Sequence, residues 1–243
     1  MSSVTKKLRH FVYSLSWDTG GRSLDVIRIL KPLLQKKSTV LDAGCGEFGL
    51  ASFIPSTQVT GVDIMGSMEQ SRNFKFLRGS IVSLPFSEKS FSIAASVDVL
   101  EHLPPDIRQQ SIAELIRVAR DAVILAFPCG SQARQIDESF AAQLNQLDKP
   151  QPDWLDEHLH SPYPQLNSIL SVIETEAIKH NKNVRTKTFY SERIQVTRSL
   201  RWAASHSKFL YLAINLLAGV MHPVTPQANK DNSYRVILLA EFS

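Results

Sequence analysis

Cysteine is scarce in this chain: only Cys45 and Cys129 occur among 243 residues. Two cysteines so far apart in sequence supply neither a disulfide framework nor the paired spacing of a zinc knuckle. Such sparing use suits a reducing compartment, and we expect a cytoplasmic protein. The first residues include basic side chains but no apolar stretch followed by a small-residue cleavage site, so we expect no signal peptide.

Long apolar runs are also missing. The longest, Phe209 to Met221, has 13 residues and would measure only about 20 Å as a helix. The hydrocarbon core of a bilayer is about 30 Å thick, which excludes an ordinary membrane span here. We expect the run to pack in the protein core, with peripheral membrane contact as the less favoured alternative.

The chain has little excess charge of either sign. It carries 27 Lys and Arg against 23 Asp and Glu, a formal net charge of +4. No basic stripe interleaved with aromatic residues occurs, so we expect no nucleic-acid partner. With 43% hydrophobic and 21% charged residues the composition is that of an ordinary globular protein. The length allows one α/β domain with additions.

What the sequence does contain is a regular alternation of strand and helix patterns. Buried or alternating apolar runs predict strands, and apolar residues spaced three or four apart predict helices. Strands are expected at Thr39–Leu41, Gln58–Ile64, Phe74–Ser80, Phe91–Val97, Asp121–Pro128, Asn183–Ser191 and Tyr234–Phe242, and helices at Ser23–Leu34, Gly49–Ile54, Pro104–Arg120 and Pro164–Asn181. This alternation predicts a doubly wound α/β fold built on a mostly parallel sheet.

A glycine-rich turn follows the first predicted strand, in "STVLDAGCGEFGLASF". Gly44, Gly46 and Gly49 stand where a chain changes direction or a ligand approaches the backbone closely, because glycine reaches positive φ at little steric cost. A strand, a glycine turn and a helix together are typical of a nucleotide-binding element. A tight structural turn without a ligand, or the turn of a dinucleotide-binding fold, would show the same spacing.

Two acids mark the ends of the first two strands. Asp63 is suited to holding the hydroxyls of a ribose, whichever adenosine cofactor carries it. A carboxylate at Asp42 would repel a pyrophosphate but attract a cofactor that carries an ammonium and a sulfonium. As an alternative, Asp42 braces the loop or caps the next helix.

The segments "VLDAGCGEFG", "VTGVDI", "RGSIVSLPFSEKSFSIAASVDVLEHLPP" and "RVARDAVILAFP" resemble successive motifs of the class I S-adenosylmethionine-dependent methyltransferases, particularly the type 11 group. The resemblance covers about residues 39 to 128. It implies a Rossmann-like, seven-stranded mixed sheet whose last strand is antiparallel, and S-adenosylmethionine as the cofactor. The rivals are an NAD-dependent oxidoreductase and a regulatory subunit that binds the cofactor without catalysis.

The resemblance also implies which residues surround the cofactor. The implied positions are Asp42, Gly44 and Gly46 at the methionine portion, Asp63 at the ribose, and Ser80 and Ile81 on either side of the adenine. The other expected cofactor-binding residues are Cys45, Ile64 and Val97. Two departures stand out. Glu47 and Phe48 make the glycine loop one residue longer than the commonest form, and Ser80 replaces an acid that many relatives carry.

His102 is the best-placed candidate for a general base, because it follows the fourth strand at the same sheet edge as the glycine loop. A structural role, as a helix cap or an interior contact, is the alternative, and it applies equally to Asp98 and Glu101. A zinc site formed by His158, His160, His102 and an acid lacks a metal-ligand spacing. We therefore expect no metal site.

We expect a single domain, with an N-terminal helical segment at 1–37 and a cofactor-binding core at 38–128. Two inserts interrupt its α/β pattern. The insert at 130–164 contains His158 and Tyr163, which we expect to contact the acceptor as part of a lid. A helical insert at 192–232 precedes the last strand. The expected acceptor is a sugar, a lipid-linked glycan or another small molecule.

Overall fold

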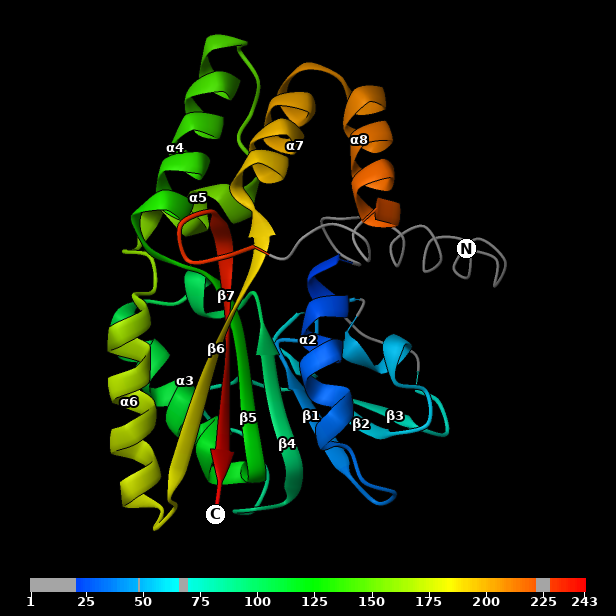
Figure 1. Cartoon of the computed structure of the whole chain (residues 1–243), viewed down its shortest axis with the longest axis vertical. Coiled ribbons are helices and arrows are strands. Elements are labelled where there is room, and N and C mark those ends of the chain that lie inside the picture. Colours follow the sequence, from blue (N-terminus) through cyan, green and yellow to red (C-terminus); the bar gives the residue numbers. More distant parts are fainter. Residues whose placement is uncertain (1–20, 48, 66–69, 222–227) are drawn as a thin grey trace.

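The computed structural model describes residues 21–47, 49–65, 70–221 and 228–243, which form an α/β fold around one seven-stranded sheet (Figure 1). The strands are β1 (Thr39–Ala43), β2 (Gln58–Asp63), β3 (Phe74–Arg78), β4 (Phe91–Val97), β5 (Ala119–Pro128), β6 (Val184–Arg193) and β7 (Ser233–Phe242). Their order across the sheet is β3-β2-β1-β4-β5-β7-β6. The order reverses between β1 and β4, the place where open α/β sheets bind their ligands.

Only β7 runs against its neighbours. β1 to β5 pair in parallel, whereas β7 lies antiparallel between β5 and β6, with Leu125 opposite Leu238. The expected Rossmann-like mixed sheet with an antiparallel last strand is therefore confirmed. β6 alternates between exposed and half-buried residues, as expected for its position at the edge of the sheet.

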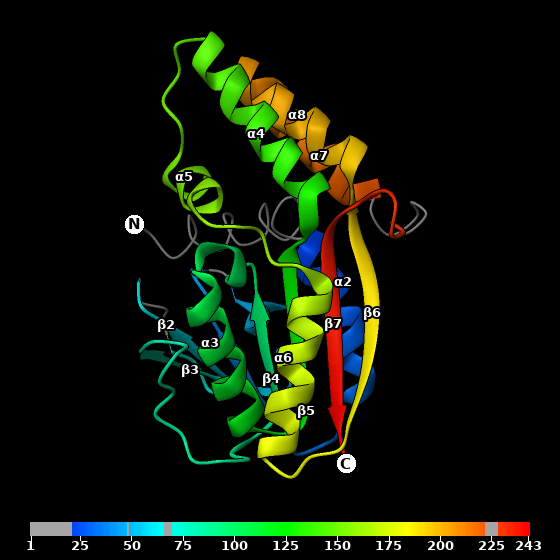
Figure 2. The same cartoon turned by 90° about the vertical axis from the view of Figure 1, so that its left-hand side faces the viewer.

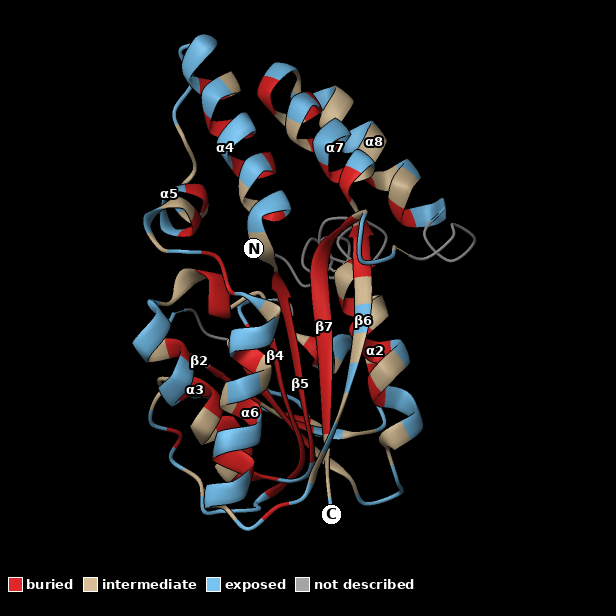
Figure 3. Ribbon diagram, turned by 60° about the vertical axis from the view of Figure 1, so that its left-hand side comes forward, coloured by how far each residue is buried: buried red, intermediate tan, exposed pale blue. Residues whose placement is uncertain are grey.

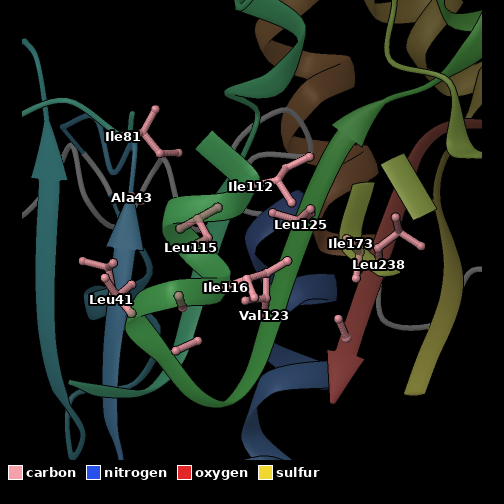
Figure 4. Packing of buried hydrophobic residues seen from close by; sticks show 14 of the residues in the cluster. Leu41, Ala43, Ile81, Ile112, Leu115, Ile116, Val123, Leu125, Ile173 and Leu238 are labelled. Carbon is pink, nitrogen blue, oxygen red and sulfur yellow. The ribbon is translucent and has the colours of Figure 1, made fainter. Parts of the chain in front are cut away.

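Helices cover both faces of the sheet (Figure 2). α2 (Arg22–Leu30), continued by the 3₁₀ turn η2 (Lys31–Leu33), packs on one face, and α3 (Pro105–Val118) and α6 (Leu166–Lys179) pack on the other. Successive strand residues face opposite sides of the sheet. Val123 and Leu125 lie in the cluster beneath α3 and α6 (Figure 4), whereas Ile124 lies in the cluster beneath α2. Both faces are thus apolar, which explains the continuous hydrophobic run in β5.

Several boundaries differ from the expectations. The helix expected at Gly49–Ile54 is only the 3₁₀ turn η3 (Leu50–Phe53), and the first helix ends at Leu30 because Pro32 follows in a 3₁₀ turn. Ala119, expected on the helix after Pro104, begins β5 instead. The glycine turn is therefore followed by the short 3₁₀ turn η3 and not by a long α-helix.

Both predicted inserts are helical, and they lie together beyond the carboxyl ends of the parallel strands (Figures 1 and 2). The first contains α4 (Gly130–Gln146) and α5 (Asp153–His160), and the second contains α7 (Ile194–His206) and α8 (Lys208–Met221). We call these four helices the helical cap. Its apolar contacts form small clusters apart from the two sheet cores, for example Phe140, Leu144 and Leu155.

The apolar run at 209–221 corrects our expectation of core packing. It forms α8, and the helix exposes much of its apolar surface (Figure 3). Phe209 is 82% exposed and Leu217 is 66% exposed, whereas Asn215 and Gly219 are the buried positions. Among the described residues, no helix combines the length and the apolar character needed to span a membrane.

Candidate functional site

A cavity of about 810 Å³ lies at the carboxyl edge of the sheet, between the glycine loop and the helical cap. It is lined by every predicted site residue except Tyr163: Asp42, Gly44, Cys45, Gly46, Asp63, Ile64, Ser80, Ile81, Val97, His102 and His158. Trp154, Arg201 and Tyr211 of the cap also line it. The fold thus brings the loop, the strand ends and both inserts to one cavity.

Two glycines of the loop serve different purposes. Gly44 has a φ of +79°, and a Cβ there would lie well under 3.0 Å from Val99, so only glycine fits against that neighbour. Gly46 has a φ of +54°, but a Cβ there would meet no protein atom within 4 Å. The space in front of Gly46 is therefore open to a ligand, whereas the space at Gly44 is filled by the protein.

Asp42 is buried beneath the loop. Its Oδ2 accepts a hydrogen bond of 2.6 Å from the backbone N–H of Leu50, so the bracing role is real. Burial raises the pKa of Asp42 to about 7, with the Leu50 hydrogen bond lowering it and the nearby charge of Asp63 raising it further. A positive charge in the cavity would favour the ionised form of this carboxyl group.

Asp63 connects the end of β2 to the glycine loop. Its Oδ2 accepts a 2.8 Å hydrogen bond from the N–H of Gly46, and its Oδ1 accepts one of the same length from Met65. A carboxylate has about four lone-pair positions, so both oxygens retain acceptor capacity toward the cavity. Cys45 lines the cavity as well, but its thiol packs against the sheet: burial raises the pKa of the thiol, and its Sγ fills the space beside Gly61.

Asp98, one candidate base, is held in an ion-pair network that the sequence did not reveal. Arg235 donates two hydrogen bonds to its carboxylate, of 2.7 and 2.8 Å, and Arg22 pairs with it as well. Although burial raises the pKa of Asp98, the two guanidinium groups outweigh it and the net shift is downward. Asp98 therefore stays ionised and is poorly suited to accept a proton.

His102 lies on the 3₁₀ turn η4 (Leu100–His102), which follows β4. Its Nδ1 contacts Oε2 of Glu157 on α5 at 2.6 Å. Burial and the neighbouring His158 lower the pKa of His102, against an opposing effect of Glu157. The imidazole is therefore neutral at pH 7, and its Nε2 is available as a proton acceptor when Nδ1 donates to Glu157.

Glu101 is 1% exposed and lies beside two histidines. Its Oε1 is 3.9 Å from Nε2 of His158, and its Oε2 has no hydrogen-bond partner among the described residues. Burial, followed by repulsion from Asp98, raises the pKa of Glu101 well above its usual range. A buried carboxyl oxygen without a hydrogen-bond partner is costly, so this arrangement calls for an explanation.

Asp137 on α4 fastens the helical cap to the sheet. Its Oδ2 accepts hydrogen bonds from the hydroxyls of Tyr163, at 2.5 Å, and Tyr234, at 2.8 Å, and lies 3.0 Å from Nδ1 of His158. Tyr163 is thus buried in this contact and is not part of the cavity wall, which corrects the direct acceptor contact expected for it. His158 does line the cavity.

Residues 41–127, the portion that holds the glycine loop, both acids and η4, match the family described as a methyltransferase domain. This matched segment, about a third of the chain, is similar to methyltransferase domains. The match agrees with the resemblance seen in the sequence, which implies S-adenosylmethionine as the cofactor.

A curated protein is similar to part of this chain. A curated protein of Encephalitozoon cuniculi whose name places it among the methyltransferases is 33% identical over 113 residues, which are 44% of this chain and 52% of that protein. The match therefore spans about half the length of that relative.

Solved structures show the same fold over nearly the whole chain. The YcgJ protein of Bacillus subtilis aligns with a TM-score of 0.53 and 18% identity, covering 91% of this chain and 97% of that one. Magnesium protoporphyrin IX methyltransferase of Synechocystis, solved with bound SAH, aligns with a TM-score of 0.52 and 15% identity, covering 100% and 89%. At these identities the likeness concerns the fold alone.

Proposed function

We propose that this chain transfers the methyl group of S-adenosylmethionine to a hydroxyl oxygen of a small polar molecule bound beneath the helical cap. A sugar or a lipid-linked glycan is the acceptor class that the sequence favours. The single observation that carries the choice of a hydroxyl is the position of His102, which lines the cavity and contacts Glu157 at 2.6 Å. Burial lowers the pKa of His102, which favours the neutral form that can accept a proton. A hydroxyl, unlike a thioether or a neutral amine, must lose a proton as it is methylated.

The cofactor would occupy the half of the cavity beside β1 and β2. The open space at Gly46 receives the methionine portion, and Asp42 lies below it as the countercharge of the cationic cofactor. Asp63 offers its remaining lone pairs to the ribose hydroxyls. Ser80 and Ile81, which also line the cavity, flank the adenine.

The acceptor would occupy the other half, between η4 and the cap. There the hydroxyl oxygen attacks the methyl carbon, so that the O–CH3 bond forms as the S–CH3 bond breaks. Nε2 of His102 takes the hydroxyl proton, and Glu157 stabilises the resulting imidazolium. The sulfonium supplies the electrophile, and the chain's remaining contribution is to align the reactants, which is worth about 7–11 kcal/mol in favourable cases.

α5 would act as the lid over this half. It supplies Trp154, Glu157 and His158 to the cavity wall, and its contacts with α4 hold it against η4. Because the lid residues lie on the acceptor side, their truncation should affect acceptor affinity more than cofactor affinity.

The test is to incubate the purified chain with radiolabelled S-adenosylmethionine and fractions of small polar metabolites, and then to identify the labelled product. Transfer to an oxygen supports the proposal. His102→Gln should lower kcat by about 10²- to 10⁴-fold with unchanged cofactor affinity, whereas His160→Gln, on the exposed side of α5, should have wild-type kinetics. Cofactor binding without transfer to any acceptor would instead indicate a regulatory subunit.

A further inference from the structure

Three side chains that differ in chemistry converge at the acceptor end of the cavity. Glu101, His102 and His158 each offer one ligand atom, and these atoms lie within 4.8 Å of one another. All three residues line the cavity. Glu101 and His102 come from η4, whereas His158 comes from the insert, so the fold and not the sequence spacing brings them together.

The two histidines are already oriented as metal ligands usually are. Nδ1 of His158 contacts Asp137 at 3.0 Å, and Nδ1 of His102 contacts Glu157 at 2.6 Å. A carboxylate that accepts the Nδ1–H of a histidine fixes the ring and leaves the Nε2 lone pair for a metal ion, an arrangement typical of zinc sites. Each imidazole ring is therefore already held by a carboxylate at its Nδ1.

Glu101 adds the third ligand and an independent indication. It is 1% exposed, and its Oε2 has no hydrogen-bond partner among the described residues. The 3.9 Å between its Oε1 and Nε2 of His158 is too long for a hydrogen bond. The histidines do not satisfy the carboxylate, but a cation between the three groups would.

We propose that Glu101, His102 and His158 bind a divalent transition-metal ion of the zinc class at the acceptor end of the cavity. Two imidazoles and one carboxylate form a donor set that suits such an ion. Metal–ligand bonds of about 2.0–2.2 Å require the ligand atoms to approach one another further, a movement within reach of small side-chain rotations. The coordination positions left open face the cavity.

The catalytic consequence rests on the proposed hydroxyl acceptor; metal binding itself does not. In the loaded protein the acceptor oxygen takes an open position on the ion, which lowers the pKa of the hydroxyl. The proton then leaves to water, the O–CH3 bond forms and the S–CH3 bond breaks. His102 serves as a ligand in this state and as the direct proton acceptor in the metal-free chain.

The test is calorimetric titration of the chelator-treated protein with Zn²⁺, together with the visible absorption spectrum after addition of Co²⁺. We expect one ion per chain. Glu101→Gln, which keeps the shape of the side chain but removes its charge, should weaken Zn²⁺ binding at least about 100-fold, and Glu157→Gln should weaken it about 10- to 100-fold. His160→Gln, the matched control on α5, should bind as the wild type does.

These readouts do not depend on turnover, so they distinguish failure of the metal site from failure of the proposed function. Absence of stoichiometric Zn²⁺ binding, or an unchanged affinity in a Glu101→Gln variant that thermal unfolding shows to be folded, overturns the metal site. Equal loss in His160→Gln would place the ion on surface histidines and overturn it too. Methyl transfer that proceeds fully in the presence of chelator would remove only the catalytic consequence.

Discussion

Alanine substitutions at Gly46 and Gly44 separate the cofactor-binding role of the glycine loop from its structural role. Both residues have positive φ, where alanine costs about 1–2 kcal/mol. At Gly46 the added methyl meets no protein atom within 4 Å, so the free energy of unfolding should fall by that amount alone. At Gly44 it collides with Val99, and overpacking adds about 1–3 kcal/mol.

Cofactor binding should respond differently from stability. The methyl group at Gly46 enters the space assigned to S-adenosylmethionine, so its affinity should fall at least about tenfold, which is about 1.4 kcal/mol. Denaturant unfolding measures the stability of each variant, and calorimetry with S-adenosylmethionine measures affinity. Normal cofactor affinity in a folded Gly46→Ala protein would refute the assigned cofactor position, and wild-type stability of Gly44→Ala would refute the loop geometry.

Three further predictions follow from the buried acids and the cap. Because burial raises the pKa of Asp42 from 3.8 to about 7, its contribution to stability is present below about pH 4 and lost as the pH rises through 7. A cationic cofactor favours the ionised carboxylate, so cofactor binding at pH 7 should release a fraction of a proton from the wild type and none from Asp42→Asn. Calorimetry in buffers of different ionisation enthalpy measures this release. Asp137→Ala should lower the free energy of unfolding by about 3–5 kcal/mol, since His158 and two tyrosines lose their acceptor, and a loss under about 1 kcal/mol in denaturant would contradict the fastening role. Trp154→Ala should raise the acceptor's KM without changing cofactor affinity, and the reverse pattern in steady-state kinetics would move Trp154 to the cofactor side.

Local patterns were sufficient to predict the sheet and the residues that line the cavity beside β1 and β2. The continuous apolar run of β5, the alternation of β6 and the prolines at the start of α3 are each properties of neighbouring residues. The strands and the helices α2, α3 and α6 could therefore be placed to within a few positions. The glycine loop and Asp63 belong to one strand–turn–strand stretch, which is why the sequence alone brings them together.

The side of the cavity beneath the helical cap depends on contacts that no local pattern records. Asp98 and Arg235 are 137 residues apart, and Asp137 and Tyr234 are 97 apart, so their pairing follows from the cap and from β7 lying beside β5. Tyr163 was expected to contact the acceptor because the sequence places it in an insert with other aromatic residues. The sequence does not show that its hydroxyl binds the buried Asp137. The exposure of α8 likewise could not be read from its hydropathy.

The most direct test of the central claim, that this chain binds S-adenosylmethionine at the glycine loop and Asp63, is calorimetric titration with S-adenosylhomocysteine and, separately, with NAD⁺. We predict one S-adenosylhomocysteine site per chain, no NAD⁺ binding, and a loss of about 1.5–3 kcal/mol of binding free energy in Asp63→Ala, the range for hydrogen bonds to a charged group. Asp121→Ala, which removes an exposed carboxylate paired with Arg120, is the control and should bind normally. Absence of S-adenosylhomocysteine binding, or an affinity unchanged by Asp63→Ala, would contradict the account.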